Sequence, residues 1–209
     1  RMASGQWNGI YLIHTKGQLP PTHNLHYVDI LSGSIGLYAY SEATGLLLPK
    51  LNLYNSRIHN HSIYGLVVQN MDAKVVNCEI SNCASYCVYL AGGKHDFIHN
   101  TIAAYYGYPY TNLNIHQNIL PEDVAAVYVN NLSNTIVRFC DFDVKRQDYW
   151  PCGAGLFLEH MYNFDIEENT LAKTNTFNGD GIGIIIKDCA VQSKIYRNGF
   201  ENLHCGNLA

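Results

Sequence analysis

Large apolar residues recur along this chain in a six-residue frame, and in the clearest part of the chain the frame repeats every 22 residues. Residues 53–58, 75–80 and 97–102 share it. Each segment begins with a large apolar residue, has a small or amide residue three positions later, and ends on isoleucine two positions after that. A fixed step of this size is the signature of a repeat architecture.

The same frame extends in both directions, with steps of 28, 22, 22, 40, 29 and 29 residues between successive copies. Its last position forms an apolar column: Ile30, Ile58, Ile80, Ile102, Phe142, Leu171 and Phe200. Its fourth position forms a middle column: Val28, Ser56, Cys78, Asn100, Cys140, Asn169 and Asn198. The first position is also apolar in every copy, which is difficult to obtain by chance.

A second set of short apolar segments precedes the frame in every copy. These segments are residues 10–12, 37–39, 66–68, 88–90, 127–129, 156–158 and 184–186. A glycine stands just before several of them: Gly9, Gly36, Gly65, Gly155 and Gly183. Runs this short, and rich in Val, Ile and Tyr, are typical of strands. Each repeat is therefore predicted to hold two short strands with turns between them.

A parallel β-helix accommodates two or three short strands in a repeat of this length, so we predict an all-β protein, a right-handed parallel β-helix of about seven to eight coils. Equivalent residues of successive coils would lie about 4.8 Å apart, which stacks isoleucine on isoleucine in the interior. The amides of Asn100, Asn169 and Asn198 would hydrogen-bond along the axis. The right hand follows from the strong preference of parallel crossovers.

With these repeats, the chain resembles the right-handed parallel β-helix proteins of the pectin-lyase-like superfamily. Residues 5–11 and 99–102 are similar in style to large surface proteins of Bacteroidetes-type bacteria. The resemblance implies a secreted protein, located outside the cell or on its outer surface. It does not imply one activity, because lyases, hydrolases, epimerases, adhesins and inert stalks share this fold.

The amino-acid composition limits the classes of partner that the protein can have. Charged residues make up 14 % of the 209 residues, and the formal net charge is −4, so nothing indicates a nucleic-acid partner. No apolar run approaches the roughly 18 residues of a membrane span. An unbroken repeat favours a single domain over residues 1–209. Neither end resembles the cap that a solenoid needs, so we expect a piece of a longer β-helix and a longer polypeptide.

Seven cysteines are present, and no CxxC pair or zinc-like spacing is found among them. Cys78 and Cys140 lie in the middle column two coils apart, and two steps of about 4.8 Å exceed the roughly 7 Å reach of a disulfide. They are most simply small core residues. A disulfide between Cys83 and Cys87 across a turn remains an alternative.

Extra residues enter after the apolar column in the later copies, at 103–125, 143–154 and 172–182. Insertions at one turn of successive coils share one edge of a solenoid, and such an edge is often the binding face. Residues 115–120 also match the frame loosely, so an extra coil is an alternative to a loop there. The predicted ligand-binding residues on this edge are aromatic: Tyr105, Tyr106, Tyr108, Tyr110, Tyr149 and Trp150.

Catalysis at the same edge is a second hypothesis. A polysaccharide lyase or epimerase needs a base and a cation that neutralises the uronate carboxylate. The base candidates are Lys145, Arg146 and His116, and the candidates for holding Ca²⁺ are Asp123, Asp148 and Asp180. A glycoside hydrolase would need two carboxylates, and Asp141 with Asp143, or Glu167 with Glu168, are candidates by residue type alone. The simpler interpretation of all these residues is ordinary solvated charge.

The short apolar segments also present an outward stripe, because side chains alternate along a strand. The stripe consists of Tyr11, Tyr38, Val67, Tyr89, Tyr128, Phe157 and Ile185. These residues either are good strand formers that a loop or partner covers, or form a platform for a sugar chain or a protein edge. The histidines His59, His61, His95 and His99 are assigned to turns and outward positions without a carboxylate partner, so no metal site is predicted.

Three functional hypotheses follow. The first is a non-catalytic surface module with a carbohydrate-binding, protein-binding or structural role and no cofactor. The second is a polysaccharide lyase, hydrolase or epimerase, with Ca²⁺ as cofactor in the lyase case. The third is a subunit of a larger bacterial surface or secretion assembly. The expected partner is a polysaccharide or another surface protein.

Overall fold

A computed structural model describes residues 7–43, 47–83, 86–103, 125–130 (backbone alone), 135–144, 153–173, 181–189 and 193–209. All regular structure in these ranges is β-strand, and every strand pairing is parallel. No helix in the described part of the chain has the length and apolar character that crossing a bilayer requires.

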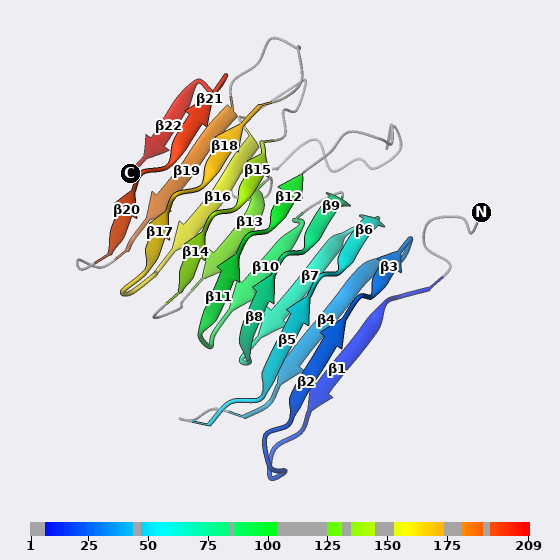
Figure 1. The fold of residues 1–209 in the computed structure, drawn as a ribbon. Helices are drawn as coiled ribbons and strands as arrows, with labels where there is room; N and C mark the ends of the chain where they lie inside the picture. Colours follow the sequence, from blue (N-terminus) through cyan, green and yellow to red (C-terminus); the bar gives the residue numbers. More distant parts are fainter. Residues whose placement is uncertain are drawn as a thin grey trace, which may run out of the picture.

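The strands form three parallel sheets that run the length of the molecule (Figure 1). Sheet A contains β1 (Ile10–His14), β4 (Ile35–Ser41), β7 (Tyr64–Gln69), β10 (Val88–Ala91), β13 (Ala125–Asn130), β16 (Gly153–Glu159), β19 (Gly181–Lys187) and β22 (Cys205–Leu208). Sheet B contains β2 (Thr22–His26), β5 (Lys50–Tyr54), β8 (Asp72–Val76), β11 (His95–Ile98), β14 (Ile136–Arg138), β17 (Asp165–Glu167) and β20 (Lys194–Tyr196). Sheet C contains β3 (Asp29–Leu31), β6 (Arg57–His61), β9 (Glu79–Cys83), β12 (Thr101–Ala103), β15 (Asp141–Asp143), β18 (Thr170–Ala172) and β21 (Gly199–Glu201).

Each coil contributes one strand to each sheet, and β22 begins an eighth turn, so the predicted right-handed parallel β-helix is confirmed. The predicted register is also confirmed. Ile30, Ile58 and Ile80 are successive partners in sheet C, and the column continues to Phe200. The prediction of two strands per repeat is wrong, because the six-residue frame itself contains parts of two strands, which two residues separate.

The first of these two residues, which we call the turn residue, makes the corner between sheets B and C. It adopts a left-handed conformation with φ between 50° and 55° in every coil: Tyr27, Asn55, Asn77, His99, Phe139, Glu168 and Arg197. A left-handed residue breaks the in–out alternation of a strand, so the next residue points inward. The middle column is therefore buried or half-buried, although it is partly polar.

Polar residues of the middle column form hydrogen bonds with the backbone N–H and carbonyl groups at the corner between sheets B and C. Asn100 Oδ1 accepts the N–H of Cys78 at 2.9 Å, and Asn169 Oδ1 accepts the N–H of Cys140 at 2.9 Å. The amide nitrogen of Asn169 donates to the carbonyl of Val137 and to Asn198 Oδ1, both at 2.9 Å. The predicted amide ladder therefore exists between Asn169 and Asn198. At Asn100 the ladder is interrupted by Cys140, and backbone groups supply most of its partners.

The glycines that precede the short apolar segments have a packing reason. A Cβ built on Gly36 would lie 2.4 Å from Ile58 Cγ2, and one on Gly183 would lie 2.6 Å from the ring of Phe200. The glycine column thus lies directly against the apolar column of sheet C, and the corner between sheets C and A leaves no space for a side chain there.

All six described cysteines are free thiols, so the alternative disulfide between Cys83 and Cys87 is not formed. Cys78 and Cys140 are buried, which confirms the prediction of small core residues, and Cys83 and Cys87 are buried as well. Burial raises the pKa of the Cys140 thiol to about 11, which keeps it protonated and unreactive.

Two histidines were assigned to the wrong face. His61 and His95 are buried, because Asn60 adopts φ 61° and turns His61 inward, while His95 lies two residues before the core residue Phe97 on one strand. His61 Nδ1 accepts the N–H of Gly33 at 3.1 Å, so the neutral ring fits its site. Burial lowers the pKa of His61, and it lowers the pKa of His95 to about 4.

These histidines predict loss of stability in acid. The unfolded chain takes up protons near pH 6.5, whereas folded His95 does so only near pH 4. The contribution of neutral His95 to the free energy of unfolding is therefore fully present above about pH 6.5. It is lost as the pH falls toward 4, and the loss reaches about 3 kcal/mol. Urea unfolding at pH 7 and at pH 4.5 measures this loss. We expect a smaller pH slope for His95→Phe, and an unchanged slope for the exposed substitution Asn24→Leu; equal slopes for all three chains would contradict the assignment.

Candidate functional site

The residues predicted for the binding edge lie outside the described residues. This holds for Tyr105, Tyr106, Tyr108, Tyr110, His116, Asp123, Lys145, Arg146, Asp148, Tyr149, Trp150 and Asp180. Their segments do leave and re-enter at one corner, because β12, β15 and β18 are neighbours in sheet C and β13, β16 and β19 are neighbours in sheet A. Residues 115–120, considered as a loop or an extra coil, also lie outside the described residues. The strands β10, β11 and β12 pair directly with β13, β14 and β15.

The outer face of sheet A carries a tyrosine patch at the N-terminal end of the solenoid. It consists of Tyr11, Tyr38 and Tyr40, and Gln69 borders it. The ring centroids of Tyr11 and Tyr38 are 5.5 Å apart, and those of Tyr38 and Tyr40 are 6.3 Å apart. Tyr38 Oη donates to Gln69 Oε1 at 2.7 Å, which fixes the central ring. Tyr11 is 45 % exposed, so the patch is open to a ligand.

Farther along sheet A, the side chains of the same stripe are covered. Val67, Phe157 and Ile185 occupy outward positions but are buried, and Phe157 is only 2 % exposed. Tyr64 and Tyr86 stack in this region with centroids 5.7 Å apart and planes 4° apart. The interpretation of a covered stripe is therefore confirmed for the later coils, which form a second apolar cluster. In the N-terminal coils the stripe is exposed, and a platform there stays a prediction.

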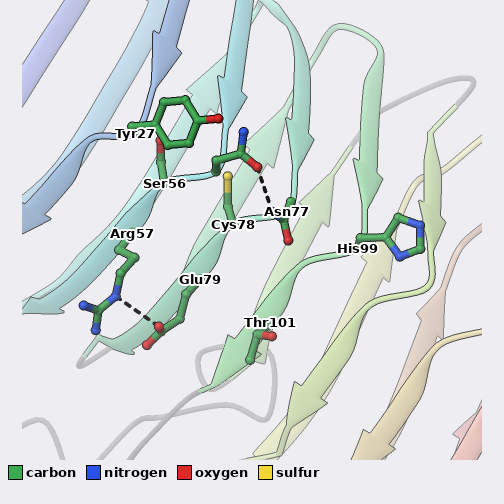
Figure 2. Close-up of a pocket in the computed structure, with 9 residues that line it drawn as sticks. Tyr27, Ser56, Arg57, Asn77, Cys78, Glu79, His99 and Thr101 are labelled. Atoms are coloured by element: carbon green, nitrogen blue, oxygen red, sulfur yellow. Dashed lines mark hydrogen bonds and ion pairs between the residues drawn. The ribbon is translucent and has the colours of Figure 1, made fainter.

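A pocket lies at the corner between sheets B and C, and we call it the corner groove. Its volume is about 360 Å³. Figure 2 shows two rows of side chains along it. The turn residues Tyr27, Asn77 and His99 form one row, to which Asn55 belongs by its place in the coil. Arg57, Glu79 and Thr101 form the other row, and Ser56 and Cys78 lie between the two.

Hydrogen bonds and ion pairs order both rows. Asn77 Nδ2 donates to Asn55 Oδ1 at 2.7 Å. Arg57 Nε lies 3.1 Å from Glu79 Oε2, and its guanidinium lies 4.0 Å from Asp29. The ring of His99 stacks on Phe139 with centroids 4.9 Å apart and planes 14° apart. The groove therefore presents amide groups between aromatic rings, with its cation already paired.

The remaining catalytic and metal candidates are dispersed. Glu167 pairs with Arg138 at 2.6 Å and Glu168 pairs with Arg197 at 3.5 Å, so each predicted hydrolase glutamate has a cationic partner. Asp141 and Asp143 share the outer face of β15. His59 lies 2.8 Å from Asp29, so the assignment of His59 without a carboxylate partner was wrong. Among the described residues, no three His, Cys, Asp or Glu side chains converge as metal ligands.

Sequence reasoning missed the corner groove. Its turn residues occupy the position just before the middle column, and Asn55 and Asn77 there are the residue type that best tolerates a left-handed conformation. An asparagine at a fixed position of two successive repeats was the available signal. Tyr27 and His99 obscured it, because neither residue type indicates a turn.

Comparisons with known proteins agree with this geometry. The family described as right handed beta helix region matches residues 8–143. The solved structure of the enzymatically active domain of tailspike protein 2 from bacteriophage CBA120 is similar, with a TM-score of 0.54 and 13 % sequence identity. The alignment covers 92 % of this chain and 38 % of that one, so this chain spans well under half of the tailspike domain. Curated protein sequences give no significant match.

Proposed function

The chain belongs to the right-handed β-helix family, and from that premise we propose that it is a glycan-binding module of a secreted or cell-surface protein. The observation that carries the proposal is the tyrosine patch on sheet A. The coil repeat sets the spacing of Tyr11 and Tyr38, and the two-residue repeat of one strand sets that of Tyr38 and Tyr40. Flat aromatic faces with hydroxyl groups suit the apolar faces and the hydroxyls of a sugar chain.

The patch is also preorganised. Tyr38 is held by Gln69, and burial, followed by the neighbouring Tyr40 and Tyr11, raises the pKa of its phenol. The phenol therefore stays neutral at physiological pH and keeps the proton that it donates to Gln69. A rigid strand surface loses little conformational entropy when a ligand binds, which favours affinity at a small interface.

Removal of the central ring tests this function. Tyr38→Ala is expected to weaken binding to a glycan selected on an array by about tenfold, because aromatic contacts contribute about 0.5–1.5 kcal/mol each. Titration calorimetry measures the loss. Tyr162→Ala is the matched control, since Tyr162 is 54 % exposed and lies outside the patch. The proposal fails if no glycan binds, or if both variants bind as the wild type does.

Glycan cleavage is the second candidate function. The similar tailspike domain is described as enzymatically active, and Asp141 and Asp143 lie on β15, which leads into the segment that contains Lys145 and Arg146. Incubation of acidic and neutral polysaccharides with and without Ca²⁺, followed by detection of new reducing or unsaturated ends, separates the two functions. Products that disappear in Asp141→Asn or in Lys145→Ala would establish an enzyme, and binding without products would establish a module.

A further inference from the structure

We infer that the corner groove is a second glycan site, selective for neutral sugars and separate from the tyrosine patch. The groove lies between sheets B and C, whereas the patch lies on sheet A. The inference takes its ligand class from the proposed function, but it rests on different residues. The first of them is Tyr27 at the N-terminal end of the groove.

Tyr27 occupies a backbone conformation that suits it poorly. Its φ is 54°, and a left-handed conformation is unfavourable for a bulky residue, while asparagine tolerates it well. The next two coils have asparagine at this position. Tyr27 gains no burial in return, because it is 81 % exposed. The fold imposes this conformation in every coil, but it does not explain why a tyrosine stands here. Residues held against their backbone preference cluster at functional sites.

Phe139 repeats this combination at the far side of the groove. It has φ 54° and is 44 % exposed, and its ring stacks on His99. Two strained aromatic residues therefore lie on either side of the Asn55–Asn77 amide pair, in one column along the axis. Tyr27 and His99 are three coil steps apart, or about 14 Å at the usual strand spacing. An extended sugar chain along the axis would stack on both rings and hydrogen-bond the amides between them.

The charges in the groove favour a neutral ligand. Arg57 lines the groove, but its guanidinium is paired with Glu79 and lies near Asp29. A uronate carboxylate placed here would have to displace one of these carboxylates and would be repelled by the other. The hydroxyl groups of a neutral sugar can use the amides, Thr101 and the phenol of Tyr27 without breaking an ion pair.

The test compares four chains: the wild type, Tyr38→Ala, Tyr27→Asn and the double variant. The probes are hexasaccharides of β-1,4-linked glucose, xylose and mannose, with hexagalacturonate as the acidic probe, in titration calorimetry. Tyr27→Asn should lower the affinity that remains in Tyr38→Ala for a neutral hexasaccharide by about 5- to 10-fold. The same substitution should raise Tm by about 2 °C or more, because it relieves the backbone. The higher Tm excludes unfolding as the cause of lost binding.

The outcomes separate this inference from the proposed function. If Tyr38→Ala abolishes all binding, the groove is not a site and the proposed function stands. If Tyr27→Asn removes binding and Tyr38→Ala does not, the groove is the site and the tyrosine patch is not. Tighter binding of hexagalacturonate than of the neutral probes overturns the inference, and so does unchanged affinity in Tyr27→Asn. Tyr162→Asn serves as the control and should bind as the wild type does.

Discussion

Replacement of Asn169 by leucine should destabilise the protein by about 3–5 kcal/mol, since each buried polar group that loses its partner costs about 1–3 kcal/mol. Asn169 is buried, and leucine has the same number and branching of side-chain heavy atoms, so the change removes the hydrogen bonds and adds some volume in a closely packed place. It removes the side-chain partner of the Cys140 N–H and of the Val137 carbonyl, and one of the two donors to Asn198 Oδ1. Urea unfolding followed by circular dichroism measures the difference.

Asn24→Leu is the matched control for this substitution. Asn24 is exposed on sheet B and its side chain bonds only at the surface, to Asn52. Its replacement should change the stability by no more than about 0.5 kcal/mol. If Asn169→Leu and Asn24→Leu lowered the free energy of unfolding equally, the hydrogen bonds of the middle column would not stabilise the corner between sheets B and C.

Gly65→Val should be at least as damaging, with a loss of about 4 kcal/mol or more, or no folded protein at all. A Cβ at Gly65 would lie 2.6 Å from the carbonyl oxygen of Cys87, 2.8 Å from Ile80 Cγ2 and 2.9 Å from Cys83 Sγ. Because the nearest atom belongs to the backbone of the next coil, a side-chain rotation cannot relieve the clash. The soluble yield and the urea midpoint of the variant measure the effect.

Gly199→Val is the control, since the nearest atom to its Cβ would be 4.0 Å away and its φ is not positive. Valine also suits a strand, so the stability of this variant should stay within about 0.5 kcal/mol of the wild type. Equal losses in Gly65→Val and Gly199→Val would mean that the corner between sheets C and A is not closely packed.

The stacking of the coils could be predicted from the sequence because each coil repeats the same physical requirement. Ile58, Ile80 and Ile102 must fill equivalent places in one core, so their spacing carries the register. The glycine column was equally visible. The reason for the glycines, which is their contact with the neighbouring apolar column, became visible only in the structure.

The corners were harder to predict, because one residue in a left-handed conformation reverses the inward and outward positions of the side chains that follow it in the coil. Asn55 and Asn77 indicate such a turn, but Tyr27 and Phe139 occupy the same place against their backbone preference. The same effect at Asn60 directs His61 into the core. Simple alternation, which assumes continuous strands, could not give these positions.

Candidate sites were harder still, because a ligand surface depends on which outward side chains are covered. The outward stripe was predicted as one feature, yet Tyr11 is open and Phe157 is buried. Sequence alone gives the direction of a side chain in a strand but not what lies over it. The corner groove needed both the turn conformation and the pairing of Arg57 with Glu79.

A crystal structure of the wild-type chain grown with a saturating neutral hexasaccharide tests the central claim most directly. Our account predicts one oligosaccharide stacked on Tyr38 at the tyrosine patch, and a second oligosaccharide in the corner groove, along the solenoid axis between Tyr27 and His99. A ligand bound elsewhere on the solenoid, with both surfaces empty at saturation, would contradict it.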